Sequence, residues 1–132
     1  MPPTEVPRGS PADWLRHARS DLVLAKSRRA DEDILLETLC FHAQQSVEKA
    51  IKGVLVYSGI PFPKTHNIGV LLDLLPPETP RDMALGEAAL LTDYAVTSRY
   101  PGDVEDVTTE ELSMAIGTAE RVLAWASGIV TG

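Results

Sequence analysis

The sequence predicts an all-α protein, an antiparallel up-and-down bundle of four long helices and one short helix. The apolar–polar alternation of strands is absent, and aromatic residues make up only 5% of the chain. Apolar residues instead recur at helical spacing. Proline interrupts helices, so the proline-free stretches 12–60, 64–75, 81–100 and 102–132 are where helices can run. The ten prolines occupy positions 2, 3, 7, 11, 61, 63, 76, 77, 80 and 101.

We expect the first helix to begin at Pro11, because proline fits the first helical position and Ser10 is a good N-cap. Asp13 adds a negative charge at the positive end of the helix. The basic residues from Lys26 onward suit its last turn. The apolar face comprises Trp14, Ala18, Leu22 and Ala25.

The second helix is expected to start at the acidic residues 31–33 and to end near Gly59, a typical helix terminator. Its predicted apolar face consists of Leu36, Leu39, Ala43, Val47, Ala50, Val54 and Leu55.

Three further helices follow. A short one is expected at about 67–75, and a fourth at about 81–98 that ends before Pro101. The last begins at Thr108, which forms a capping-box pattern with Glu111. In the fourth helix the residues expected in the core are Met83, Leu90, Leu91 and Tyr94. In the last they are Leu112, Ala115, Ile116, Ala119, Val122, Leu123 and Ala126.

A length of 132 residues suits one domain, which we place at 11–130 after a disordered tail at 1–10. No apolar run approaches the ~18 residues of a membrane span, and the N-terminus lacks a signal region. We therefore expect a cytoplasmic protein. A single cysteine, Cys40, excludes an internal disulfide and a zinc ribbon.

The net charge of −7 argues against broad electrostatic binding of nucleic acid. Residues 1–66 contain nine Lys/Arg and eight Asp/Glu, whereas residues 67–132 contain three and eleven. A site for an anion must therefore be local, with most of its cations in the first half. The three histidines lie on separate predicted elements, so no metal site is expected.

Two patterns are candidate functional sites. His42, Gln45, Lys49 and Lys52 form one polar stripe on the second helix, opposite its apolar face. The stripe is either a solvated surface or a row of donors facing a subunit or a phosphate. Arg99, held by the following proline and glycine, either binds phosphate or pairs with its own helix end and nearby acids.

Three segments together resemble the HEPN domain, the nucleotide-binding helical domain of higher eukaryotes and prokaryotes. They are Phe41–Lys52 (FHAQQSVEKAIK), Pro63–Asn67 (PKTHN), and Tyr94 with Ser98–Pro101 (SRYP). The resemblance implies a homodimeric bundle, often paired with a minimal nucleotidyltransferase. It also implies nucleotide binding or, in many members, metal-independent RNA cleavage by the toxin of a toxin–antitoxin pair.

The ribonuclease members have an arginine followed four to six residues later by a histidine. Arg99 fits the first half of this motif, but residues 100–106 contain no histidine and none follows His66. Histidine normally supplies the acid–base step near neutral pH. The departure therefore favours a protein that is not a ribonuclease.

The leading hypothesis is a non-catalytic nucleotide- or partner-binding module that requires no cofactor or metal and takes ATP, GTP or AMP. The resemblance implies these contacts: phosphate held by Arg99 and Lys49 or Lys52, the ligand oriented by His66 and Gln45, and a stacking ring from Tyr94 or Tyr100. One alternative is a ribonuclease that uses Arg99 with His66 or His42. The other is a purely structural homodimer.

Overall fold

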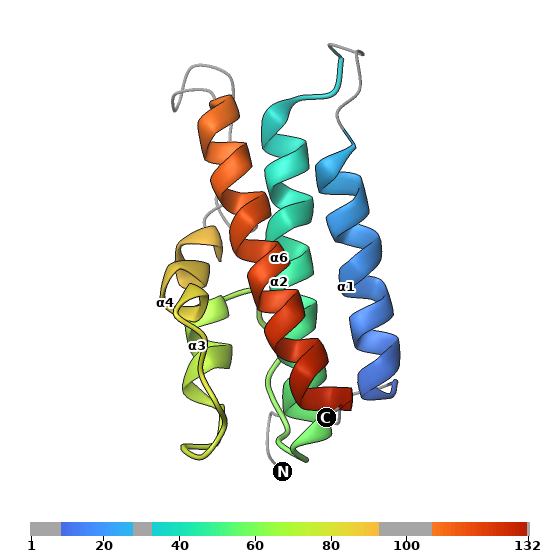
Figure 1. Cartoon of the computed structure of the whole chain (residues 1–132), viewed down its shortest axis with the longest axis vertical. Coiled ribbons are helices and arrows are strands. Elements are labelled where there is room, and N and C mark those ends of the chain that lie inside the picture. The colour runs from blue at the N-terminus through green and yellow to red at the C-terminus, as the bar shows by residue number, and fades with distance from the viewer. Residues whose placement is uncertain (1–8, 28–32, 93–106, 132) are drawn as a thin grey trace.

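Three long helices form the body of the molecule in a computed structural model that describes residues 9–27, 33–92 and 107–131. They are α1 (Pro11–Lys26), α2 (Leu36–Tyr57) and α6 (Thr109–Thr131). Figure 1 shows them side by side, with α1 running opposite to both α2 and α6. The described ranges contain helices and no strand, so the predicted all-α bundle is confirmed.

The shorter elements pack on the side of the bundle away from α1 (Figure 1). They are α3 (Ile68–Asp73), α4 (Ala84–Ala88) and the 3-10 helix η1 (Ala89–Thr92). α3 contacts α2, and α4 contacts α6. No helix in the described part of the chain has both the length and the apolar character needed to cross a membrane.

The predicted helix starts of α1 and α6 are confirmed by their caps. The Ser10 hydroxyl accepts a hydrogen bond from the Asp13 amide at 3.1 Å, and the Asp13 carboxylate accepts one from the Ser10 amide at 3.2 Å. Thr108 and Glu111 make the same reciprocal pair at the start of α6, at 3.0 and 2.9 Å. Each cap satisfies backbone donors that the first turn leaves unpaired.

α2 begins later than predicted and ends as predicted. Its N-cap is Leu35, which provides no side-chain cap, so the helix starts beyond the acidic residues. At the other end Gly59 has φ of +73°, a conformation that glycine adopts without strain. The chain then turns back, and Asn67 caps α3 by accepting a hydrogen bond from the Val70 amide at 3.2 Å.

The core lies where α2 packs between α1 and α6. The predicted apolar faces of these three helices point into it, although Trp14, Leu36 and Ile116 are only partly buried. Leu15 of α1 is also buried, which the predicted face did not include. Because α2 has a helix on each side, its burial extends well beyond one face.

The predicted core of the fourth helix is wrong in two positions. Met83 is 86% exposed and Leu90 is 73% exposed, whereas Leu91 is buried as expected. The α-helix begins only at Ala84 and changes to 3-10 geometry at Ala89, which shifts the angular phase of the following residues. Ala84, Leu85 and Ala88 therefore face the core. Tyr94 and the predicted helix end lie outside the described residues.

The segment before α4 is held on α6 by two side chains. The Trp125 indole donates to the Pro80 carbonyl at 2.7 Å, and the Arg121 guanidinium pairs with Asp82 at 3.1 Å. Asp82 also accepts from the Ala84 amide at 2.7 Å. These contacts fix where α4 begins.

α1 and α2 approach each other closely at Gly53. A Cβ atom placed there would lie 3.2 Å from Trp14 Cβ and 3.3 Å from Leu15 Cδ2. Such distances are shorter than ordinary van der Waals contact, so the absence of a side chain sets the spacing of the two helices.

We expect Gly53→Val to lower the free energy of unfolding by about 1–3 kcal/mol, because the added methyl groups must push α1 away from α2. Chemical denaturation measures the change. The matched control is Gly128→Val in α6, where, outside its chain neighbours and the nearby backbone of its own helix, no described atom lies within 4 Å of the added Cβ. Equal effects at the two glycines would contradict the close-packing explanation.

Candidate functional site

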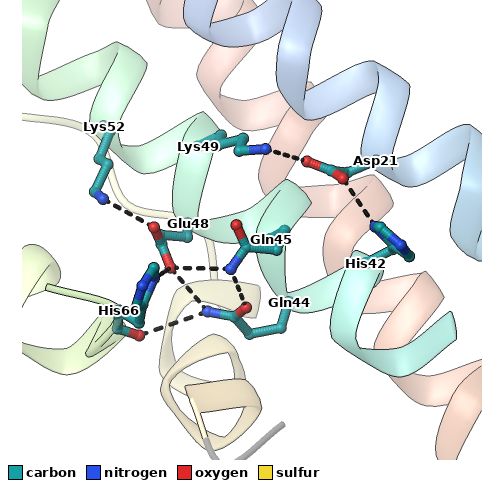
Figure 2. A network of polar contacts seen from close by, with 8 residues as sticks. All are labelled: Asp21, His42, Gln44, Gln45, Glu48, Lys49, Lys52 and His66. Atoms are coloured by element: carbon teal, nitrogen blue, oxygen red, sulfur yellow. Dashed lines mark hydrogen bonds and ion pairs between the residues drawn. The ribbon is translucent and has the colours of Figure 1, made fainter. Parts of the chain in front are cut away.

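The polar stripe of α2 takes part in two networks, each centred on one buried carboxylate. Figure 2 shows the two centres, Asp21 from α1 and Glu48 from α2 itself. Neither carboxylate is among the sequence-predicted site residues. All four stripe residues contact one of them or its immediate neighbours. The stripe is therefore neither a free solvated surface nor a row of unengaged donors.

The first network joins α1 to α2 through Asp21. One carboxylate oxygen lies 3.0 Å from Nδ1 of His42, and the other accepts from the Lys49 ammonium at 2.6 Å. Asp21 itself is buried, and it occurs on the same face of α1 as the core residues Ala18 and Ala25. An aspartate on the apolar face of α1 is visible in the sequence, and it could have identified Asp21 as the centre of a polar network.

The second network surrounds Glu48, whose side chain is only 3% exposed. One oxygen accepts from the Lys52 ammonium at 2.8 Å, and the other lies 2.9 Å from Nδ1 of His66. That second oxygen also accepts from the side-chain amides of Gln44 at 3.1 Å and Gln45 at 3.4 Å. The i, i+4 spacing on either side of Glu48 is visible in the sequence, but the contact with His66 is not.

Burial by itself would raise the pKa of Glu48, because it penalises the charged form. The hydrogen bonds from Lys52, His66 and Gln44, together with the Lys52 charge, outweigh this effect and hold the pKa below its ordinary value of 4.5. Glu48 is therefore an ionised carboxylate at neutral pH, although it is buried.

Two aromatic rings cover the Lys52 end of this network. The ammonium nitrogen lies 5.9 Å from the ring centroid of Trp14 and 5.5 Å from that of Phe62. The two rings meet edge to face at 6.0 Å. Phe62 is buried, so the loop between α2 and α3 is anchored here and positions His66 just before the α3 N-cap.

Among the residues of the two networks, His66 reaches furthest into solvent. Its side chain is 60% exposed, compared with 27% for Lys49 and 10% for Lys52. Each lysine already has a carboxylate partner, so a phosphate would have to compete with Asp21 or Glu48 for it. Phosphate binding by Lys49 or Lys52 stays a prediction.

The structure separates some predicted site residues and leaves others undescribed. His42 and His66 are held by different carboxylates and do not share a centre. Gln45 belongs to the Glu48 network, in which it also donates to the Gln44 side-chain oxygen at 2.8 Å. Arg99, Tyr94 and Tyr100 lie outside the described residues, and their roles also stay predictions.

A cleft of about 320 Å³ lies beside Lys49, at the N-terminal half of α1. Its lining combines one aromatic wall with several polar side chains: Gly9, Asp13, Trp14, Arg16, His17 and Lys49. Within the described ranges, no group of three His, Cys, Asp or Glu side chains is arranged to hold a metal ion.

Comparisons with known proteins agree with the resemblance drawn from the three sequence segments. The sequence profile of the HEPN domain matches residues 11–129. TT1696 from Thermus thermophilus has a similar structure, with a TM-score of 0.75 and 28% identity over 90% of this chain and 97% of that one. ST0689, an archaeal HEPN homologue, has a TM-score of 0.71 and 29% identity over 93% and 99%. No protein of curated function matches.

We expect Glu48→Gln to be destabilising at pH 7, by about 3 kcal/mol, because it leaves Lys52 buried without a charged partner. The folded-state pKa of Glu48 is below its unfolded value, so the wild-type carboxylate contributes stability above the unfolded pKa and loses it as the pH falls through the folded one. The difference between wild type and variant should therefore shrink in acid. Urea unfolding from pH 7 down to pH 3 measures it.

The control for this pH series is Glu87→Gln, which removes an equal charge from an exposed position of α4. Its difference from wild type should stay small throughout. A Glu48→Gln difference that is constant with pH would show that the carboxylate charge is not the source of the effect.

Proposed function

Because the chain belongs to the HEPN domain family, we propose that it is a non-catalytic binding module, homodimeric, that engages a nucleotide or a minimal nucleotidyltransferase. The observation that carries the proposal is the pairing of an exposed imidazole with a buried, charge-balanced carboxylate: His66 on Glu48. Such a pair supports a solvent-facing group in a fixed orientation, which is what ligand recognition requires.

The energetics of the Glu48 network support a role beyond stability. Burying a carboxylate and an ammonium costs several kcal/mol per ion, and their attraction often only repays that cost. Apolar residues of similar size would serve the core equally well. We therefore infer that the role of the Glu48 network is to orient the His66 ring at the surface.

The cleft beside Lys49 supports a small-molecule ligand in particular. Its volume of about 320 Å³ is at the lower end of the range of known ligand pockets. The Trp14 wall suits a flat ring, and Arg16, His17 and Lys49 provide donors for an anion. Asp13 also lines the cleft and pairs with Arg16, and Lys49 pairs with Asp21, so an anion bound here has to compete with these two carboxylates.

Exposed apolar side chains support the homodimer part of the proposal. Met83, Leu90 and Met114 are all largely exposed; Met83 precedes α4, Leu90 is in η1, and Met114 is in α6, which α4 contacts. Large exposed apolar side chains are compatible with a protein–protein contact on this side of the bundle.

A thermal-shift titration with ATP, GTP and AMP tests the nucleotide. A ligand at about 100 times its Kd stabilises the folded protein by roughly 2.7 kcal/mol, which raises the Tm by several degrees. We expect the shift in wild type and a smaller one in Arg99→Ala and in His66→Ala. The Tm shift of Arg16→Ala tests separately whether the nucleotide binds in the cleft, because the Arg16 side chain lines the cleft and is highly exposed.

The matched control is Arg121→Ala, which removes a cation that pairs with Asp82 on the α4 side of the bundle. It should keep the full shift. If no nucleotide shifts the wild type, the nucleotide part of the proposal is wrong, and a partner-dependent module or a structural homodimer replaces it.

A metal-independent ribonuclease is the second candidate function. The observation that favours it is that His42 and His66 each have Nδ1 on a carboxylate, which is how a general-base histidine is oriented. Under this candidate the purified protein cleaves RNA in EDTA, and His66→Ala or His42→Ala lowers the rate by about 100-fold or more. Full cleavage by both variants, or none by wild type, would exclude it.

A further inference from the structure

The protonation of the His66 ring is determined by what surrounds its Nδ1 atom. That atom lies 2.9 Å from one oxygen of Glu48, a distance at which one of the two must donate a proton. The same oxygen already accepts from the Gln44 and Gln45 amides, and the other oxygen accepts from the Lys52 ammonium. Glu48 is thus surrounded by donors and acts as an acceptor towards all of them.

The orientation of the Gln44 amide agrees with this direction. Its oxygen accepts from Gln45 at 2.8 Å, so its nitrogen is the atom that faces Glu48. Every contact of the network can then be satisfied only if the His66 ring donates through Nδ1–H. The neutral ring has one proton, so its other nitrogen, Nε2, has a free lone pair.

We infer that Glu48 holds the imidazole of His66 with its proton on Nδ1, so that Nε2 presents a lone pair to solvent and recognises a hydrogen-bond donor of the ligand, a hydroxyl or an amino group. The ring is 60% exposed, and its Nδ1 edge is the one turned to Glu48 (Figure 2). Nε2 has no partner among the described residues.

This inference deepens the proposed function and rests on it for the existence of a ligand. It also changes the kind of contact expected at His66. A neutral ring that offers a lone pair repels a phosphate oxygen and attracts an O–H or N–H group. For a nucleotide, the contact would therefore fall on the sugar hydroxyls or on a base amino group, and the phosphate would be held elsewhere.

Long-range ¹H–¹⁵N correlation NMR of the free protein at pH 8 tests the tautomer. We expect His66 to show a protonated Nδ1 and an unprotonated Nε2. His17 is the internal reference, since it is exposed and has no partner among the described residues, and an unrestrained imidazole prefers the proton on Nε2. A His66 pattern equal to that of His17 would overturn the inference.

Glu48→Gln should move the proton of the His66 ring from Nδ1 to Nε2, and the NMR pattern of the two ring nitrogens should change accordingly. The amide oxygen of Gln would face the Lys52 ammonium, which can only donate, and the amide nitrogen would face Nδ1 and donate to it. The proton of the ring then moves to Nε2. His42 serves as the matched control, because its partner Asp21 is unchanged and its pattern should stay the same. Should this variant fail to fold, the wild-type spectrum still decides the tautomer.

The donor class is tested with AMP, 2′-deoxy-AMP, 3′-deoxy-AMP and the analogue that lacks the 6-amino group. One analogue should bind about three- to tenfold more weakly than AMP to wild type, and this difference should vanish in His66→Ala. Equal losses in both proteins would overturn the assignment of a donor to Nε2. If no nucleotide binds at all, the proposed nucleotide function fails, whereas the tautomer measurement is unaffected.

Discussion

The ion pair between Glu48 and Lys52 is the interaction on which the polar side of α2 depends. A carboxylate at this depth would otherwise lose its charge or destabilise the fold. Lys52 approaches to 2.8 Å, and Trp14 and Phe62 cover it, so the two charges attract each other where little water screens them. With one oxygen of Glu48 occupied by this cation, the other is left to the neighbouring amides and to His66.

The position of His66 therefore has two independent supports. One is electrostatic, through Glu48, and the other is apolar, through Phe62 packed in the loop between α2 and α3. The tight turn at Gly59 and the cap at Asn67 fix the two ends of the same loop. A ring that is mostly in solvent is thus oriented by contacts on its buried edge, as a recognition site requires.

Local signals predicted most of the fold, because helix starts and apolar faces depend on residues three or four positions apart. The capping pairs at Ser10 and Thr108 are examples. The prediction misplaced Met83 because the start of α4 is set by Asp82 and its distant partner Arg121, and it misplaced Leu90 because the helix changes to 3-10 geometry at Ala89. In the site, the stripe on α2 and its i, i+4 spacing around Glu48 were visible in the sequence. The contacts of Asp21 with His42 and Lys49, and of His66 with Glu48, join different elements and were not. Arg99 and the two tyrosines near it remain predictions.

The arrangement of the long helices also bears on the order in which the chain folds. Contacts between α1 and α2, such as those of Asp21, join residues 21 and 28 positions apart, whereas Lys26–Glu120 and Arg19–Ser127 join residues 94 and 108 apart. Closing longer loops costs more entropy, so we expect the α1–α2 hairpin to form before α6 docks. Before α6 docks, the side of α2 that contacts α6 in the folded protein is exposed to solvent. In a growing or refolding chain, that strip is where we expect premature association to begin.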